Sequence, residues 1–123
     1  MVIGINYYTQ PEQQLYGCIN DATNIANFLV QECNFDRKEI TLMTDSFENI
    51  NSIRYPTKAN IISNLVKTVN KIKNEGYREI WCSYSGHGIY VADQNNDEVD
   101  GKDEAICPID SKLLTDDEIK NIF

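Results

Sequence analysis

One histidine, His87, is the residue whose type and setting best suit catalysis in this chain. Gly86 and Gly88 flank it, and it follows an apolar segment that ends at Tyr84. Because imidazole gains and loses a proton near neutral pH, a histidine held in such a turn can act as a general base or acid. The N–H of Gly88 could also face a developing oxyanion. A histidine tolerated in a glycine turn is the structural alternative.

An acidic segment, residues 93–118, is the second concentration of reactive groups. It holds ten Asp or Glu residues and two Lys, so it carries the whole net charge of −8. Calcium takes about six to eight oxygen ligands, many of them carboxylates. The segment therefore indicates either a solvated acidic loop or a site for a hard cation. The charge also argues against nucleic acid or an anionic membrane as the main partner.

The composition is that of one small domain. The chain has 123 residues, and 41% of them are apolar, which is enough to bury a single core. Four cysteines without a C-x-x-C pair, beside one histidine, give little support for a zinc site. We expect reduced thiols in a soluble, cytoplasmic protein, because no apolar run approaches the roughly 20 residues of a membrane-spanning helix and no leader pattern begins the chain.

Strands and helices are expected to alternate. Apolar runs predict strands at residues 2–5, 39–43 and 79–84, and helical spacing predicts helices at 20–32 and 57–76. Such alternation favours a parallel sheet with helices on its faces, in which active sites lie at the carboxyl ends of the strands. The histidine comes just beyond the third strand, which is where such a site is expected.

Local signals fix the expected helix ends. Asn20 or Asp21 is expected to cap the first helix, and Thr57 the second, which should end before Gly76. A capping-box pattern at residues 115–118 is expected to open a last, short helix.

Five groups of motifs, in order along the chain, resemble the start of the catalytic domain of a metacaspase, a family in the caspase-like clan of cysteine peptidases. They are Ile3–Tyr8, Leu15–Ala22, Pro56–Ile61, Tyr84–Gly88, and the acidic set Asp100–Glu104, Pro108–Asp110 and Asp116–Glu118. The resemblance implies a caspase-like three-layer α/β sandwich with a mostly parallel sheet, incomplete at its C-terminus. Residues 1–123 would then be the N-terminal part of the peptidase domain.

The resemblance also implies an activity. His87 would be the catalytic histidine, partner of a cysteine thiolate that attacks the peptide carbonyl and forms an acyl-enzyme. Metacaspases cleave polypeptides after arginine or lysine, and the acidic specificity pocket would include Asp21, with Ser85 as a wall residue. For Asp21 the structural alternative is an acid that interacts favourably with the helix dipole.

Calcium is the cofactor that the resemblance implies, because many members of the family need it. The positions that match the family's ligands are Asp103, Asp116 and Asp117, and Asp100 could replace Asp103. Asp116 and Asp117 have the same structural alternative as Asp21, since both lie in the first turn of an expected helix.

The expected nucleophile is missing from the chain. In caspase-like sequences the histidine precedes the cysteine by about 50 residues, which here falls beyond Phe123. None of the four cysteines has the family's Asp-x-Cys-His-Ser-Gly-like context; Cys82 is expected to be inert inside the third strand, and Cys18 lies near the expected pocket. We therefore expect a fragment, inactive by itself, that needs the missing C-terminal half. A non-catalytic caspase-like binding module and an acidic calcium-responsive domain are the alternatives.

Overall fold

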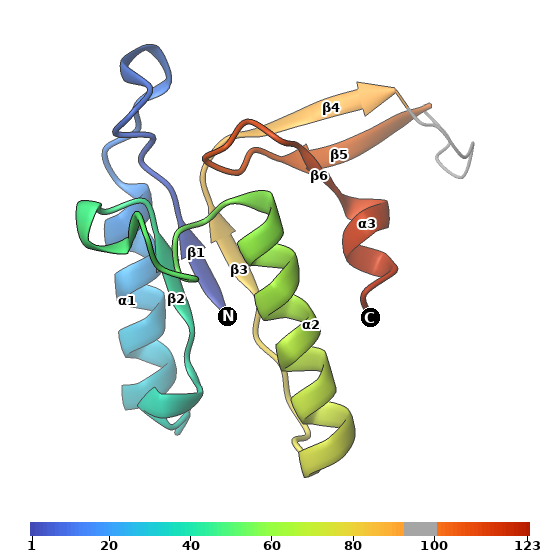
Figure 1. Ribbon diagram of the computed structural model, residues 1–123. Helices are drawn as coiled ribbons and strands as arrows, with labels where there is room; N and C mark the ends of the chain where they lie inside the picture. Colours follow the sequence, from blue (N-terminus) through green and yellow to red (C-terminus); the bar gives the residue numbers. More distant parts are fainter. Residues whose placement is uncertain (93–100) are drawn as a thin grey trace.

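Strands and helices alternate in the computed structural model, which describes residues 1–92 and 101–123 (Figure 1). The N-terminal part comprises β1 (Val2–Gly4), α1 (Cys18–Gln31), β2 (Leu42–Thr44), α2 (Lys58–Glu75) and β3 (Ser83–Ser85). The C-terminal part comprises β4 (Gly88–Ala92), β5 (Lys102–Ile106), β6 (Leu114–Thr115) and α3 (Asp116–Lys120). Three short 3-10 turns are η1 (Pro11–Gln13), η2 (Arg37–Glu39) and η3 (Phe47–Asn49).

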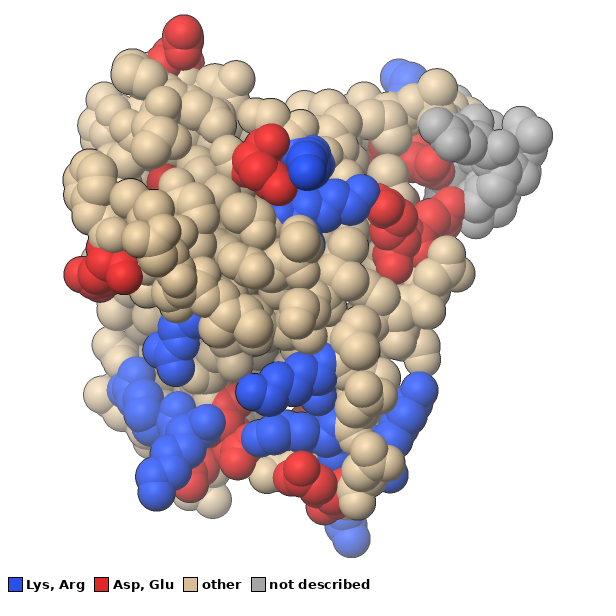
Figure 2. All heavy atoms as spheres, in the orientation of Figure 1, with Lys and Arg blue, Asp and Glu red and all other residues tan. Residues whose placement is uncertain are grey.

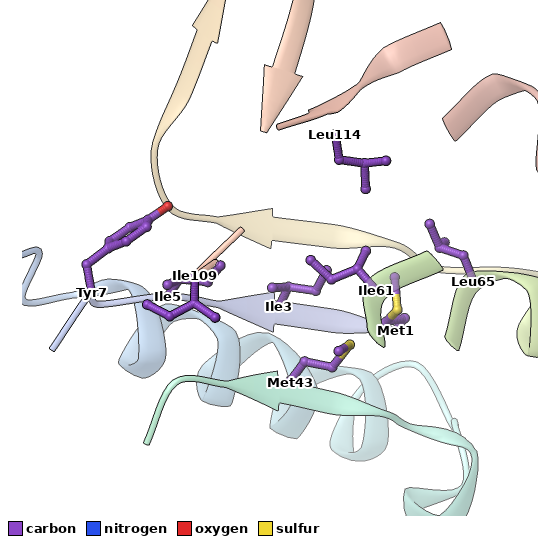
Figure 3. Close-up of a cluster of buried hydrophobic side chains, with 9 residues drawn as sticks. All are labelled: Met1, Ile3, Ile5, Tyr7, Met43, Ile61, Leu65, Ile109 and Leu114. Carbon is purple, nitrogen blue, oxygen red and sulfur yellow. The ribbon is translucent and has the colours of Figure 1, made fainter. Parts of the chain in front are cut away.

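The first three strands form a parallel sheet in the order β2-β1-β3. Successive side chains of a strand point to opposite faces, and each face here is covered by one helix. Ile3 and Met43 pack with Ile61 and Leu65 of α2 (Figure 3), whereas Val2 packs on the other face with apolar residues of α1. The layers are thus helix, sheet and helix, and the expected caspase-like α/β fold is confirmed.

The predicted ends of α2 are confirmed by their cap geometry. The Thr57 hydroxyl accepts the N–H of Asn60, and Gly76 follows the helix in the left-handed conformation, with φ 74°. The predicted capping box is also present, because Thr115 and Glu118 exchange side-chain and backbone hydrogen bonds at the start of α3.

The predicted start of α1 is wrong. The helix begins at Cys18, with Gly17 as N-cap and no capping side chain of its own. Instead the Asn6 side chain, which follows β1, accepts the N–H of Ile19 at 3.2 Å. A residue outside the helix thus satisfies a donor of its first turn, in place of a capping side chain from the helix start itself.

The predicted strand bounds are also corrected. β2 begins three residues later than expected, because residues 37–39 form η2, and β3 keeps only Ser83–Ser85 of the expected segment. Cys82 consequently precedes β3 and is exposed, not buried inside a strand. The antiparallel sheet β4-β5-β6 was not expected. The first three residues of β5 are charged, so its sequence does not alternate between polar and apolar residues, and only the burial of its side chains alternates.

Close packing of α1 on β1 requires a residue without a side chain at Gly4. A Cβ built there would collide with the Cys18 carbonyl oxygen and would lie 2.7 Å from the Cβ of Ala22. We predict that Gly4→Ala lowers the free energy of unfolding by about 1–3 kcal/mol, the usual cost of overpacking. Gly17→Ala is the control, because a Cβ there meets nothing within 4 Å. Urea denaturation of both variants measures the difference, and equal midpoints would contradict the packing argument.

Candidate active site

His87 connects β3 to β4 and lies just beyond the carboxyl end of the parallel sheet. Its Nε2 is 2.7 Å from the carbonyl oxygen of Gln13, in the loop that follows β1. A carbonyl oxygen can only accept, so the neutral imidazole carries its proton on Nε2 and donates it to Gln13. Nδ1 is then left with a lone pair that can take a proton from another group.

Tyr7 contacts both the ring and the backbone of His87. The two ring centroids are 4.7 Å apart, with a tilt of 39° between the planes. The Tyr7 hydroxyl accepts the N–H of His87 at 2.9 Å and donates to the Cys107 carbonyl oxygen at 2.7 Å. In Figure 3 this hydroxyl lies where the chain bends between β3 and β4. Tyr7 is 1% exposed and has φ 59°, which is uncommon for a residue other than glycine.

Tyr84 supplies a second hydroxyl at the same place. It donates to the His87 carbonyl oxygen at 2.8 Å and lies 3.0 Å from the Tyr7 hydroxyl. Burial is the main cause that raises the pKa of Tyr7, and it is also the main cause that raises the pKa of Tyr84. Both phenols therefore remain protonated and able to donate across the neutral pH range.

Sequence reasoning missed the parts played by Gln13, Tyr7 and Tyr84 around the histidine. Only the glycines beside His87 were a usable signal, because they mark a constrained turn. Tyr7 is 80 residues from the histidine in sequence, and no local pattern could place its hydroxyl there.

Gly88 is exposed and opens β4, opposite Ile106. The pair before it, His87 and Cys107, is hydrogen-bonded, with the Cys107 N–H donating to the His87 carbonyl oxygen at 3.0 Å. Hydrogen-bonded and non-bonded pairs alternate in an antiparallel ladder, so the Gly88 N–H points away from β5. β4 is the edge strand in this sheet as described, and this amide is thus directed toward the open edge.

Asp21 and Ser85 are brought together from different elements. Asp21 is exposed in the first turn of α1, and Ser85 is the last residue of β3. The Ser85 hydroxyl donates to Asp21 Oδ2 at 3.4 Å. Because Ser85 is two residues from His87, a carboxylate lies on the same end of the sheet as the histidine.

The three expected calcium ligands lie on neighbouring elements. Asp103 is buried on β5, and Asp116 and Asp117 begin α3. In the described ranges 1–92 and 101–123, no three acidic, histidine or cysteine side chains gather as they would around a metal ion. Asp100, the alternative ligand, lies outside the described residues.

Asp116 nevertheless has the features of a ligand. Its Oδ1 is buried and has no hydrogen-bond partner among the described residues, while its Oδ2 is 3.4 Å from the Lys120 ammonium. Asp116 also lines, with Glu104 and Gly88, a cavity of about 440 Å³ between the β4-β5 hairpin and α3. The donor chemistry therefore fits a hard cation, although the described carboxylates supply only part of its coordination shell.

The four cysteines are free thiols, and their positions differ. Cys18 is buried, Cys33 and Cys82 are exposed, and Cys107 is half-buried, with a thiol pKa that burial raises. Among the described hydrogen bonds, none joins a cysteine sulfur to the His87 ring. In residues 1–92 and 101–123, the printed contacts of the imidazole are with Gln13 and Tyr7.

Positive charge gathers away from this site. Figure 2 shows the largest group of Lys and Arg at the lower end of the molecule, where α1 and α2 end in Figure 1. A groove there is lined by five basic residues, Lys38, Arg54, Lys67, Lys71 and Arg78, and by three acidic ones, Asp36, Glu39 and Glu79. His87 lies beyond the opposite, carboxyl end of β3.

The sequence family agrees with this geometry. The whole chain, residues 1–123, matches the family description "Metacaspase, peptidase C14 domain". The chain belongs to the metacaspase family. Metacaspase-1B of Aspergillus fumigatus is 39% identical over 126 residues, and Metacaspase-1B of Neurospora crassa is 38% identical over 126 residues.

This metacaspase chain spans less than a third of those relatives. Each alignment covers 100% of the chain, but only 30% of the Aspergillus protein and 28% of the Neurospora protein. Among solved structures, protein GSU0716 from Geobacter sulfurreducens superposes with a TM-score of 0.65 at 27% identity, covering 98% of this chain and 42% of that one. In the described residues, no helix of the metacaspase chain is long and apolar enough to cross a membrane.

Proposed function

We propose that this chain is the N-terminal part of the catalytic domain of a cysteine endopeptidase and that His87 is its general base. The observation that carries the proposal is the imidazole itself, whose Nε2 donates to the Gln13 carbonyl at 2.7 Å. That bond fixes the tautomer with a free lone pair on Nδ1. Such a group can take the proton of a thiol, which is what a cysteine nucleophile requires.

The proposed reaction has two steps. Nδ1 of His87 takes the thiol proton of a cysteine that lies further along the full-length protein, and the thiolate attacks the peptide carbonyl. The Gly88 N–H, directed toward the sheet edge, donates to the oxyanion. The imidazolium then protonates the leaving amine, which leaves a thioester. Water, deprotonated by the neutral imidazole, hydrolyses that thioester, and the imidazolium returns the proton to the thiolate.

The proposed substrates are polypeptides with arginine or lysine at the cleaved position. Asp21 would pair with the cationic side chain, and the hydroxyl of Ser85 would line the same pocket. Support comes from the position of this carboxylate at the same end of the sheet as His87 and from the gathering of Lys and Arg at the other end of the molecule. The free thiols agree with a cytoplasmic, reducing location, which we also propose.

We further propose that calcium activates the enzyme. Asp103, Asp116 and Asp117 would supply carboxylate oxygens to it, and the buried Oδ1 of Asp116 has no hydrogen-bond partner among the described residues. The bound cation would hold β5 and α3 together through these acids, which lie on both elements.

The alternative to a peptidase is a non-catalytic caspase-like module that binds a partner protein. The candidates differ in whether the full-length protein carries an Asp-x-Cys segment about 50 residues after His87. Presence of that segment supports the peptidase, and another residue there supports the module.

Cleavage assays on the full-length protein test the peptidase and its calcium dependence together. The assay uses peptides that differ at one position only. We expect cleavage when that position is Arg or Lys, and no cleavage when it is Asp. Thiol alkylation or calcium chelation should remove the activity. Asp116→Asn should raise the calcium concentration needed for half-maximal rate about tenfold or more, whereas Asp36→Asn, which changes an exposed acid of η2, should not. Cleavage that survives both treatments would refute the proposal.

A further inference from the structure

We propose that Tyr7 and Tyr84 are positioning residues for His87: the Tyr7 hydroxyl replaces one bond of the β4-β5 ladder at the His87 N–H, and the Tyr84 hydroxyl binds the His87 carbonyl oxygen. The geometric part of this proposal stands on the hydrogen bonds alone. Its catalytic consequence rests on the proposed peptidase function.

The ladder is incomplete at the histidine. His87 lies directly opposite Cys107, one step beyond the Gly88–Ile106 pair. A hydrogen-bonded antiparallel pair normally exchanges two N–H···O bonds, but only the Cys107 N–H makes its bond directly, at 3.0 Å. The His87 N–H reaches the Cys107 carbonyl through the Tyr7 hydroxyl, by contacts of 2.9 Å and 2.7 Å. A side chain from the loop after β1 therefore occupies a place in the sheet.

The hydroxyls of Tyr7 and Tyr84 each donate to a backbone carbonyl oxygen. The shortest acceptor for Tyr7 is the Cys107 carbonyl at 2.7 Å, and for Tyr84 it is the His87 carbonyl at 2.8 Å. Each phenol has one proton to donate, and the Tyr84 hydroxyl also lies 3.0 Å from the Tyr7 hydroxyl and 3.2 Å from the Cys107 carbonyl oxygen, so its proton is shared among these acceptors. Both backbone groups of His87 are consequently bound to one or other tyrosine.

The position of Tyr7 is itself imposed by the buried carboxylate of Asp45. One oxygen accepts the N–H of Asn6 at 2.7 Å and the other accepts the N–H of Tyr8 at 3.0 Å. These amides flank Tyr7, whose left-handed backbone is thereby enforced, and an aromatic residue adopts that conformation only under such constraint. The turn directs the hydroxyl at His87.

The backbone at Gly86, just before the histidine, lies in close contact with the hydroxyls of Tyr7 and Tyr84. A Cβ at Gly86 would meet the Tyr84 hydroxyl at 2.5 Å and the Tyr7 hydroxyl at 3.0 Å. The backbone thus passes directly over the two phenols. With the Tyr7 ring against the imidazole and Nε2 on Gln13, the histidine is fixed at its ring and at both backbone groups.

Tyr7→Phe and Tyr84→Phe test the proposal, since each keeps the ring and removes one hydroxyl. Tyr55→Phe is the matched control, because Tyr55 packs half-buried against the same core cluster and hydrogen-bonds to Thr9. In the full-length enzyme we expect kcat to fall about tenfold for each of the first two variants, with KM unchanged, because displaced catalytic groups lose rate without losing binding. The control should keep its kcat.

Amide hydrogen exchange at His87 gives a second readout that needs no activity. Loss of the Tyr7 hydroxyl should speed exchange of the His87 N–H at least tenfold relative to the control at equal thermal stability, because that N–H loses its acceptor. Unchanged exchange would overturn the geometric claim. Unchanged kcat in both variants, in a protein that His87→Ala inactivates, would overturn the catalytic claim. A fully active His87→Ala enzyme would instead refute the peptidase mechanism. The exchange data would then still test the hydrogen bonds between His87 and Tyr7.

Discussion

Replacement of His87 by alanine will reduce peptide cleavage by the full-length protein at least about a thousandfold, the scale of a lost general base and acid. The reason is that the imidazole of His87 offers the site a nitrogen that can accept a proton and return it. Nε2 is bound to Gln13, so Nδ1 is the atom available to deprotonate a thiol and later to protonate the leaving amine. Alanine offers neither function, and no other histidine exists in the chain to substitute for it.

The same substitution should leave the fold nearly unchanged. The bonds that join His87 to Tyr7, Tyr84 and Cys107 use its backbone N–H and carbonyl, which alanine retains. The imidazole itself is only half-buried, and among the described residues its hydrogen bond is to Gln13. A thermal melt should therefore separate lost chemistry from lost structure.

His87→Gln sharpens the experiment. The glutamine amide can donate to the Gln13 carbonyl but cannot accept and return a proton near neutral pH. We expect it to be as inactive as alanine. Activity above a tenth of wild type in either variant would show that His87 is not the base, and would leave the tolerated turn histidine as the correct interpretation.

The parts that sequence reasoning placed correctly are those fixed by local chemistry. Thr57 and Gly76 delimit α2 because a cap hydroxyl and a left-handed glycine act within one helical turn. His87 was located by its two glycines and by the strand before it, which required no knowledge of distant residues.

The parts that it placed wrongly depend on partners far along the chain. Asn6 supplies the cap of α1 from the loop after β1, which no window around the helix contains. β5 was missed because its Lys102, Asp103 and Glu104 lower its apparent strand propensity. Pairing with β4 on one side and β6 on the other, together with burial of Asp103, makes this segment a strand.

Substitution of Asp21 is the second change with a large expected effect. It distinguishes a role in stabilising α1 from a role in binding substrate. We predict that Asp21→Asn lowers kcat/KM for an arginine peptide about 10- to 100-fold, the range for a lost hydrogen bond between charged groups. A carboxylate next to a helix N-terminus contributes only about 0.3–1 kcal/mol to stability, so the melting temperature should change little.

The discriminating comparison is between substrates. If Asp21 binds the cationic side chain, Asp21→Glu should retain part of the preference for arginine over an uncharged residue, and Asp21→Asn should remove it. Ser85→Ala should have the smaller effect, because the hydroxyl only lines the pocket and donates to Asp21 at 3.4 Å. Equal losses for charged and uncharged peptides would contradict binding of the cationic side chain and leave Asp21 as a helix acid. The cationic side chain would then need another partner, such as a second carboxylate or an aromatic face.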